Sequence, residues 1–289
     1  MSYQPLVSVV IPTKNSEGTL ENCLRSIKGQ TYPNIEMVVV DNYSTDKTRE
    51  VAQKYTRVFV KGPERSSQRN LGSKNAHGDY LFFVDSDMEL APKVVEECIW
   101  EAFKKKAHAI IVPEVSSGEG FWTKCKALER SCYIGDQSIE AARFFRRDVF
   151  FEVGGYDEEL VGTEDWDLNQ KISKAGYRIG RIDAVIKHNE GKLSLWKTMK
   201  KKYQYGKTLG KYKEKHPKEA TQQFNIVRPA FIRNWKKLAK DPLNAAGLTI
   251  LKTCEFGAAG IGYLNCNFFI SKLKPQRISR PENEDNSTR

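Results

Sequence analysis

The sequence Tyr80-Leu-Phe-Phe-Val-Asp-Ser-Asp87 joins a run of bulky apolar residues to a pair of carboxylates. A short run of this kind is typical of a strand that is buried on both of its faces. Because alternate residues of an extended chain point the same way, we expect Asp85 and Asp87 on one side at the strand's end. Such a pair suits Mg²⁺ or Mn²⁺, which proteins commonly bind through one or two carboxylates together with phosphate oxygens. A solvated loop after the strand is the alternative that these residues alone leave open.

The same pattern recurs on both sides of this segment. Further strands are predicted at residues 7–11, 35–40, 57–60, 109–112, 141–145, 177–183 and 184–188. Helices are predicted between them, at residues 16–28, 48–55, 67–75, 92–106, 121–131, 147–153 and 164–175. Strands that alternate with helices predict an α/β fold with a mainly parallel central sheet. Ligands of such sheets bind beyond the carboxyl ends of the strands, and the polar segments 12–15, 41–46 and 85–87 all fall there.

Three further polar sites have both a structural and a chemical interpretation. Asp41 follows an apolar strand, where it either forms a turn or accepts hydrogen bonds from a nucleobase. Glu164 and Asp165 open a helix, where the helix dipole favours carboxylates and Thr163 can cap. The same pair is also suited to general-base catalysis beside a metal site. His188 follows a short strand, either as an ordinary unligated histidine or as a metal ligand.

Six segments form an ordered set of short motifs. They are Val9-Val-Ile-Pro-Thr-Lys-Asn15, Val39-Val-Asp-Asn-Tyr-Ser-Thr-Asp-Lys-Thr48, Arg69-Asn-Leu-Gly72, Gly78-Asp-Tyr-Leu-Phe-Phe-Val-Asp-Ser-Asp87, Gly154-Gly-Tyr-Asp157 and Thr163-Glu-Asp-Trp-Asp-Leu168. In this order they resemble a family 2 glycosyltransferase of the GT-A fold, over roughly residues 5–190. Each motif alone is common, but the ordered set is highly specific. The resemblance implies a Rossmann-like GT-A domain over residues 1–190.

The resemblance also implies which residues bind the donor, a nucleotide-diphosphate sugar. The nucleoside pocket would be lined by Pro12, Thr13, Asn15 and Asp41. Arg69 resembles the basic residue that lies by the base or the phosphates. The ribose, the diphosphate and a Mn²⁺ or Mg²⁺ ion would be held by Asp85, Ser86 and Asp87. Neither UDP nor GDP is singled out by these residues.

Catalytic and further metal roles follow in the same way. Asp165 resembles the catalytic base, and Glu164 would position the acceptor or the sugar. His188 resembles a late histidine that contacts the metal or the diphosphate, so Asp85, Asp87 and His188 are the predicted metal ligands. The implied reaction is an inverting, metal-dependent sugar transfer to a hydroxyl acceptor, which needs deprotonation. A polyprenyl-phosphate sugar synthase, whose phosphate acceptor needs no base, is the alternative.

Two features depart from the family pattern. Tyr43 stands where glycine is usual, so the loop around the nucleoside is expected to differ. A Gln-x-x-Arg-Trp motif is absent from the sequence, which argues against a processive polysaccharide synthase.

The chain's basicity lies in its C-terminal third. Residues 191–280 hold 20 Lys and Arg against 4 Asp and Glu, whereas the formal net charge of the whole chain is +11. We expect a basic, amphipathic, mostly helical region there and a disordered tail at 281–289. The segment Lys197–Lys215 either closes over the diphosphate or forms a solvated helix face. The apolar tract 243–270 is too interrupted for a spanning helix, so it is predicted as an interfacial or core helix.

This region sets the expected partners and location. Trp196, Phe231 and Trp235 lie among many lysines, which favours peripheral contact with the cytoplasmic face of a membrane and a polyprenyl-linked acceptor. Packing as an ordinary core is the alternative. A different class, a non-catalytic protein that binds nucleic acid or membrane, lacks any recognised nucleic-acid motif, so no nucleic-acid partner is expected. Six cysteines without CxxC spacing predict reduced thiols, and no signal peptide is predicted.

Overall fold

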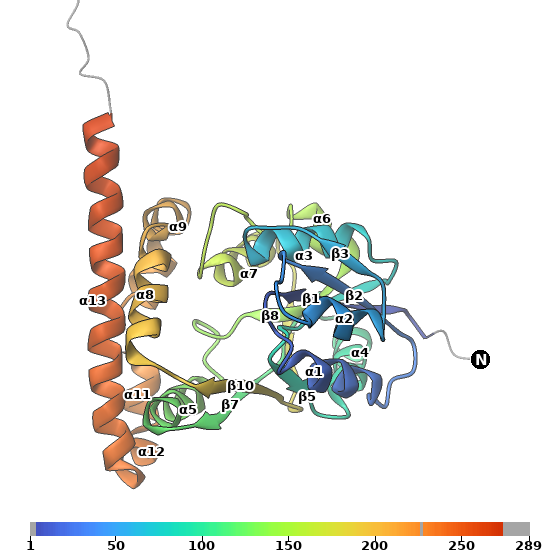
Figure 1. The fold of residues 1–289 in the computed structure, drawn as a ribbon, viewed down its shortest axis with the longest axis horizontal. Helices are drawn as coiled ribbons and strands as arrows, with labels where there is room; N and C mark the ends of the chain where they lie inside the picture. The colour runs from blue at the N-terminus through green and yellow to red at the C-terminus, as the bar shows by residue number, and fades with distance from the viewer. Residues whose placement is uncertain (1–3, 226–227, 274–289) are drawn as a thin grey trace, which may run out of the picture.

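The computed structural model describes residues 4–225 and 228–273, so the predicted disordered tail lies outside the described residues. Its centre is a seven-stranded sheet in the order β3-β2-β1-β4-β8-β6-β9 (Figure 1). The strands are β1 (Val7–Thr13), β2 (Ile35–Asp41), β3 (Val58–Val60), β4 (Tyr80–Phe83), β6 (Ala109–Ile111), β8 (Ala142–Arg146) and β9 (Ile179–Arg181). Strand β8 is antiparallel to β4 and β6, and the other pairs are parallel. The expected mainly parallel α/β fold is confirmed.

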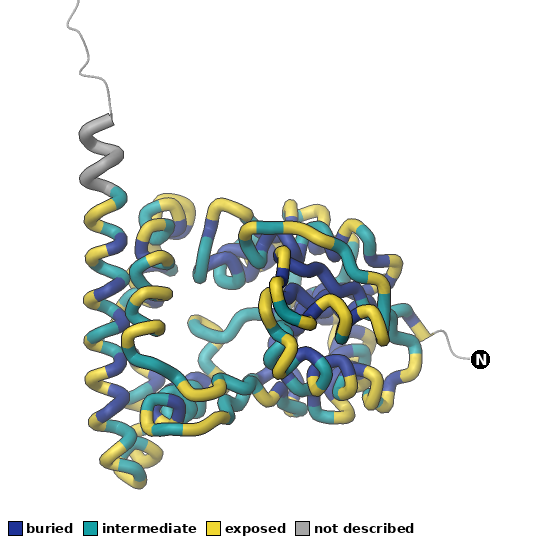
Figure 2. The backbone as a smooth tube through the Cα atoms, viewed as in Figure 1, coloured by how far each residue is buried: buried dark blue, intermediate teal, exposed yellow. Residues whose placement is uncertain are grey.

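Helices cover both faces of this sheet (Figure 1). One layer holds α1 (Leu20–Lys28), α2 (Thr48–Gln53) and α4 (Val94–Lys104), and the other holds α3 (Arg65–Lys74), α6 (Arg147–Glu152) and α7 (Glu164–Lys174). Strand β1 shows why, since Val9 and Ile11 pack into the first layer while Val10 packs into the second. All three side chains are fully buried, and Figure 2 shows the central strands as the buried part of the molecule. A strand that is buried at every position therefore requires helices on both sides.

A second, three-stranded sheet was not predicted as such. It has the order β5-β10-β7, with β5 (Met88–Leu90), β10 (Ile186–Lys192) and β7 (Glu114–Glu119). Strand β7 reads Glu-Val-Ser-Ser-Gly-Glu, which carries a single apolar residue and no alternation. Its extended form comes from parallel pairing with β10, because strand formation depends strongly on neighbouring strands. Strand β10 also runs across residue 190, where the domain boundary was placed.

The C-terminal part is helical, as expected. Helices α8 (Leu195–Gly206), α9 (Leu209–Lys215), α10 (Pro217–Gln223), α11 (Pro229–Arg233), α12 (Trp235–Lys240) and α13 (Pro242–Leu273) form it, and α5 (Phe121–Tyr133), from earlier in the chain, packs against it. Helix α13 stands along α8 and reaches α5 at one end (Figure 1). There Leu248 and Leu251 pack on Cys125 in a small separate core. None of the helices within the described ranges has the length and apolarity that crossing a membrane requires.

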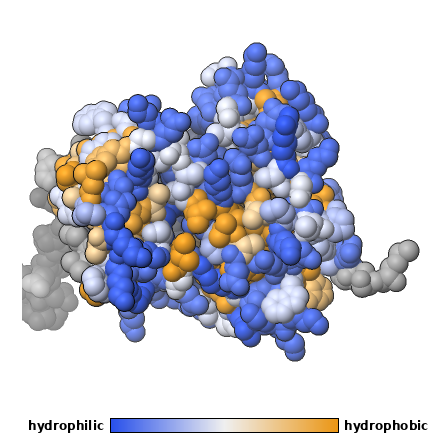
Figure 3. Space-filling view, turned by 90° about the horizontal axis from the view of Figure 1, so that it is seen from below, coloured by the Kyte–Doolittle hydropathy of each residue, from blue (hydrophilic) through white to orange (hydrophobic). Residues whose placement is uncertain are grey.

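The same helical part exposes several large apolar side chains. Trp196 is 73% exposed at the start of α8, and Trp235 is 60% exposed on α12. Leu243, at the start of α13, is exposed as well. The view from below shows hydrophobic residues gathered at the side where these helices lie (Figure 3). All six cysteines are free, in agreement with the expected thiols.

Candidate functional site

A cavity of ≈ 720 Å³ lies beyond the carboxyl ends of β1 and β4, and helices α8 and α13 contribute to its wall. We call it the main cavity. The residues predicted from the sequence that line it are Pro12, Thr13, Asn15, Asp85, Ser86, Asp87, Glu164, Asp165 and His188. Arg69 and Asp41 are not part of the lining and lie behind it. The fold thus gathers residues that are up to 176 positions apart in sequence, counted from Pro12 to His188.

Arg69 lies fully buried beneath this cavity and connects two of its carboxylates. Its Nη2 donates to Asp85 Oδ1 at 2.8 Å, and its Nη1 donates to Asp165 Oδ1 at 3.0 Å. Its guanidinium also lies 5.1 Å from the ring centre of Tyr156. Burial alone would raise the pKa of Asp85, but Arg69, Arg143 and Arg65 outweigh burial and hold that pKa well below its usual range. Asp85 is therefore ionised, and its position is fixed relative to that of Asp165.

His188, which also lines the main cavity, lies between two carboxylates. Its Nε2 lies 3.4 Å from Asp87 Oδ2, and its Nδ1 lies 3.2 Å from Glu114 Oε2. Burial would lower the pKa of His188, but the hydrogen bonds to Asp87 and Glu114 prevail and raise it to about 9. Asp87 Oδ1 is buried without a hydrogen-bond partner. A carboxylate behind a histidine commonly orients the ring so that its other nitrogen can bind a metal.

The end of the cavity at β1 is held by a tight loop–loop network. Asp41 is fully buried, and its carboxylate accepts hydrogen bonds from Thr13 Oγ1 at 3.1 Å and from the Ser44 backbone N–H at 2.8 Å. The turn interpretation therefore describes its contacts, and its contact with a nucleobase stays a prediction. Asn15 Oδ1 accepts from Thr45 N–H at 2.9 Å, which joins the two loops. Tyr43 has φ of +49°, the left-handed region that glycine adopts without cost, and this accounts for glycine being usual there.

Glu164 and Asp165 begin α7 in different environments. Glu164 is buried with Oε2 unpartnered, and burial followed by the charge of Asp165 raises its pKa. The side chain of Asp165 is 32% exposed towards the cavity. Thr163 stands at the N-cap position of the helix, but its side chain makes no capping hydrogen bond, so the predicted capping interaction is wrong. Asp165 is thus the carboxylate of the pair that a ligand can reach.

A sequence profile described as Glycosyl transferase family 2 matches residues 8–156, just over half of the chain. The chain belongs to this family. The expected family and the expected enzyme class, a glycosyltransferase, are thereby confirmed. Succinoglycan biosynthesis protein ExoA of Rhizobium meliloti (strain 1021) is 26% identical over 198 residues, which cover 61% of this chain and 60% of that protein. The chain spans 58–60% of the length of the first curated relatives that it matches.

Solved structures share the fold of this glycosyltransferase. Mannosyltransferase PcManGT from Pyrobaculum calidifontis, in complex with GDP-Man and Mn²⁺, has a TM-score of 0.64 at 18% identity and covers 91% of this chain and 88% of its own. S. aureus TarS 1-349 in complex with UDP-GlcNAc has a TM-score of 0.52 at 18% identity, with 92% of each chain covered. At these identities the likeness shows the fold alone. That fold is the expected GT-A fold.

Several residues of the glycosyltransferase site were not predicted from its sequence. Arg65 lies 3.8 Å from Asp85 Oδ2 and donates to the hydroxyl of Tyr205 at 3.0 Å. Arg143, on β8, lies 3.6 Å from Asp85 Oδ2 and also pairs with Glu114. The signal available beforehand was the segment Lys197–Lys215, whose Thr198, Lys201, Lys202 and Tyr205 do line the main cavity. Nothing in the local sequence marked Arg65 and Arg143 as site residues, because the carboxylates that they contact lie on other elements.

Proposed function

We propose that this glycosyltransferase moves a sugar, with inversion, from a UDP- or GDP-linked donor to a hydroxyl acceptor and depends on Mn²⁺ or Mg²⁺. One observation carries the proposal. Arg69 binds Asp85 of the Asp-Ser-Asp motif and Asp165 at the same time, so the donor-side carboxylates and the base are held in one fixed arrangement. A protein that used only its basic C-terminal region would not need this arrangement. GDP-Man and UDP-GlcNAc in the two related structures support both donor nucleotides as candidates.

The residues around His188 fit a divalent ion. Asp87 offers a buried oxygen without a partner, and His188 offers Nε2 beside it while Glu114 engages Nδ1. A carboxylate and an imidazole that face a cavity leave further positions for diphosphate oxygens. We therefore propose Asp87 and His188 as protein ligands, with Asp85 beside them, paired with three arginines. Because its raised pKa leaves His188 protonated at pH 7, the ion would bind in exchange for one proton of the ring. When bound, the ion would offset the charge that develops on the leaving diphosphate.

The transfer step assigns one task to each group. Asp165 accepts the proton of the acceptor hydroxyl as that oxygen forms a bond to the anomeric carbon. The bond from the anomeric carbon to the diphosphate oxygen breaks, and its electron pair leaves with the nucleoside diphosphate. Because the hydroxyl attacks from the side opposite to the diphosphate, the configuration is inverted. Arg65 and Lys201 line the cavity as cations that stabilise the departing diphosphate.

The acceptor and the location are proposed from the C-terminal helices. Exposed Trp196, Trp235 and Leu243 lie among exposed lysines, a combination typical of helices that lie on an anionic membrane surface. We propose a polyprenyl-linked glycan as acceptor and peripheral contact with the cytoplasmic face of a membrane. The alternative, a polyprenyl-phosphate sugar synthase, would transfer to a phosphate oxygen and would not need Asp165.

The test is Asp165→Asn, compared with Asp183→Asn at an exposed position. We expect Asp165→Asn to lose roughly 10²–10⁴-fold in transfer rate, the usual contribution of a general base. Donor binding with Mn²⁺, measured by calorimetry, should stay within a fewfold of the unchanged protein, since Asn keeps one hydrogen bond to Arg69. Full transfer activity in Asp165→Asn would reject Asp165 as the base and favour the phosphate acceptor. Loss of donor binding together with activity would instead assign Asp165 a structural role.

A further inference from the structure

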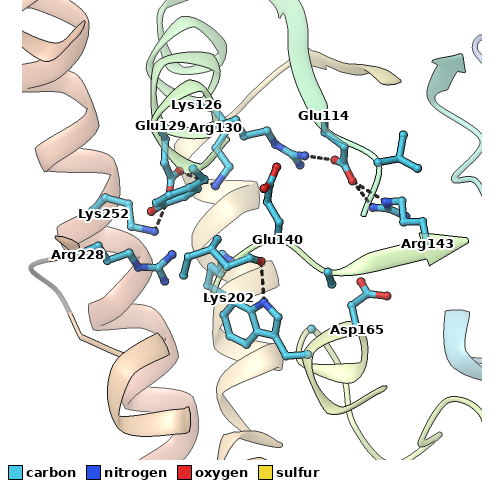
Figure 4. Close-up of a pocket in the computed structure, with 16 residues that line it drawn as sticks. Glu114, Lys126, Glu129, Arg130, Glu140, Arg143, Asp165, Lys202, Arg228 and Lys252 are labelled. Atoms are coloured by element: carbon cyan, nitrogen blue, oxygen red, sulfur yellow. Dashed lines mark hydrogen bonds and ion pairs between the residues drawn. The ribbon is translucent and has the colours of Figure 1, made fainter. Parts of the chain in front are cut away.

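A second cavity of ≈ 290 Å³, whose lining Figure 4 shows, shares Asp165 with the main cavity. We call it the basic cavity. Six basic and four acidic side chains line it, and Asp165 and Arg143 also belong to the main cavity or its immediate wall. The basic cavity therefore adjoins the proposed base. Its excess of positive charge predicts an anionic ligand.

Most of the charges in the basic cavity are already neutralised. Glu129 on α5 is bound by Lys126 at 2.7 Å and by Lys252 at 2.9 Å. Glu114 is bound by Arg130 and Arg143 (Figure 4). These ion pairs join α5, α13, β7 and β8. The other two acidic side chains are paired as well, Glu140 with Arg181 and Asp165 with Arg69, so all four have a cation partner within the protein.

Two cations remain without a carboxylate partner among the described residues, namely Lys202 and Arg228. Arg228 is only 8% exposed, and its Nε is buried with no hydrogen-bond partner. Its Nη2 donates to the Gln223 carbonyl at 3.1 Å, and its guanidinium lies 5.1 Å from the ring centre of Tyr133. Lys202 also points into the site, where its ammonium lies 5.5 Å from the ring centre of Tyr205. A buried guanidinium nitrogen without a partner is costly unless a ligand binds it.

An apolar groove continues from the same two cations. It has a volume of ≈ 290 Å³ and is walled mainly by residues of α7, α8, α9 and α13, with Leu209, Phe224, Phe256 and Tyr263 among its lining residues. Lys202 and Arg228 line both the groove and the basic cavity, and so does Trp166. The cations therefore stand at the junction between a polar space that reaches Asp165 and an apolar space that leads away from it.

We propose that the basic cavity and the apolar groove form an acceptor subsite for an amphipathic phosphate, with the phosphate at Lys202 and Arg228 and the apolar chain along α8 and α13. The inference rests on the proposed function, because the acceptor hydroxyl must reach Asp165 from this side. The phosphate is here an anchoring group and not the nucleophile. Arg and Lys bind phosphate through charge-assisted hydrogen bonds, and the groove supplies the apolar contact that a free phosphate would not use.

Binding alone tests the proposal, so its failure is separate from any failure of catalysis. Dodecyl phosphate below its critical micelle concentration is titrated into the full chain by calorimetry at pH 7, beside inorganic phosphate and neutral dodecyl maltoside. We expect dodecyl phosphate to bind at least tenfold more tightly than either of the other two. Inorganic phosphate binding equally well would overturn the amphipathic acceptor in favour of a site for free phosphate. Dodecyl maltoside binding equally well would overturn the role of the cations.

Matched variants locate the phosphate. Lys202→Gln and Arg228→Gln should each weaken dodecyl phosphate at least tenfold, whereas Lys200→Gln, an exposed lysine on the same helix, should change it less than twofold. Because burial disfavours the charged form of Lys202, its replacement should not lower the melting temperature, so a loss of binding is not a loss of folding. Equal affinity of Lys202→Gln and Lys200→Gln would overturn the proposal.

A second matched pair locates the chain. Gly260 lines the groove, and an added Cβ there meets nothing within 4 Å. Gly260→Leu should therefore weaken dodecyl phosphate at least fivefold and leave inorganic phosphate unchanged. Gly257, one turn earlier, has the same open surroundings but lies outside the groove, so Gly257→Leu should affect neither ligand. The proposal fails if the two leucine variants bind dodecyl phosphate alike.

The pH dependence gives an independent readout. Burial lowers the pKa of Lys202 to about 8, so its positive charge is present at pH 7 and is lost as the pH rises through 8. The charged groups that face it are Lys126 and Glu129 on α5, Lys252 and Glu255 on α13, and Arg228, Asp165 and Glu140 around the cavity. A phosphate monoester has a second pKa of about 6 and keeps its charge over this range. Affinity should fall roughly tenfold from pH 7 to 9, and a fall of the same size in Lys202→Gln would overturn the assignment.

Discussion

Helix α13 can lie against α8 only because glycines occupy the contact. A Cβ on Gly206 would come within 2.9 Å of the Ala259 carbonyl carbon, and one on Gly262 would come within 3.1 Å of the Tyr203 carbonyl carbon. Carbon atoms pack best at about 3.5–4.0 Å, and in both cases the carbonyl oxygen lies nearer still, so either alanine must push the two helices apart by roughly 1 Å. The obstacle is backbone and cannot swing aside. We therefore expect Gly262→Ala to destabilise the fold by roughly 1–3 kcal/mol, the usual cost of overpacking.

Gly257→Ala on the same helix is the matched comparison, since its Cβ would meet nothing within 4 Å. Alanine at an unobstructed helix position gains about 0.5–1 kcal/mol over glycine. The two variants should thus differ by roughly 1.5–4 kcal/mol, which corresponds to roughly 3–16 °C in melting temperature for a chain of this size. Thermal unfolding followed by circular dichroism measures the difference. If Gly262→Ala melts at or above Gly257→Ala, the close contact between α8 and α13 is not as described here.

Two further results are expected at the proposed metal site and at the helices proposed to contact a membrane. Glu114→Gln should weaken Mn²⁺ binding by roughly 10–100-fold, because Glu114 orients His188. Glu119→Gln, at an exposed position of the same strand, should leave Mn²⁺ binding unchanged. Electron paramagnetic resonance measures both affinities, and equal values would contradict the role of Glu114. Trp235→Ser should lower partition onto vesicles of phosphatidylcholine and phosphatidylglycerol roughly tenfold, while Trp100→Ser, exposed on α4, should have no effect. Binding of oligonucleotides in place of vesicles would contradict the membrane proposal.

The sequence predicted those parts of the fold whose apolar pattern is strong. Strands β1 and β4 are apolar at nearly every position, so their burial and the polar residues at their ends followed directly. Strand β7 could not be predicted, because its Glu-Val-Ser-Ser-Gly-Glu has no apolar alternation and depends on pairing with β10. The start of α1 was also placed too early, since the helix begins at Leu20 rather than near residue 16.

The site divides in the same way. Asp85, Asp87 and Asp165 were predicted because each stands at the end or start of a patterned element. Glu114 belongs to the unpatterned strand β7, so no local signal marked it as the partner of His188. Lys202 and Arg228 were visible as basic residues. That no carboxylate of the described residues pairs with them appears only once α5, α7 and α13 are packed around them. Pairing in space is the information that a single sequence does not contain.

Arg69 explains why the separate motifs form one unit. Its guanidinium is fully buried, and a buried charge that loses its partner costs several kcal/mol. Asp85 and Asp165 offset that cost from opposite sides, at 2.8 and 3.0 Å. Each carboxylate is therefore held in place by a cation that the other helps to retain. Moving the proposed base would therefore disturb the Asp-Ser-Asp motif as well. Arg69, which itself does not line the cavity, thus links the proposed site of the sugar donor to the proposed site of proton removal.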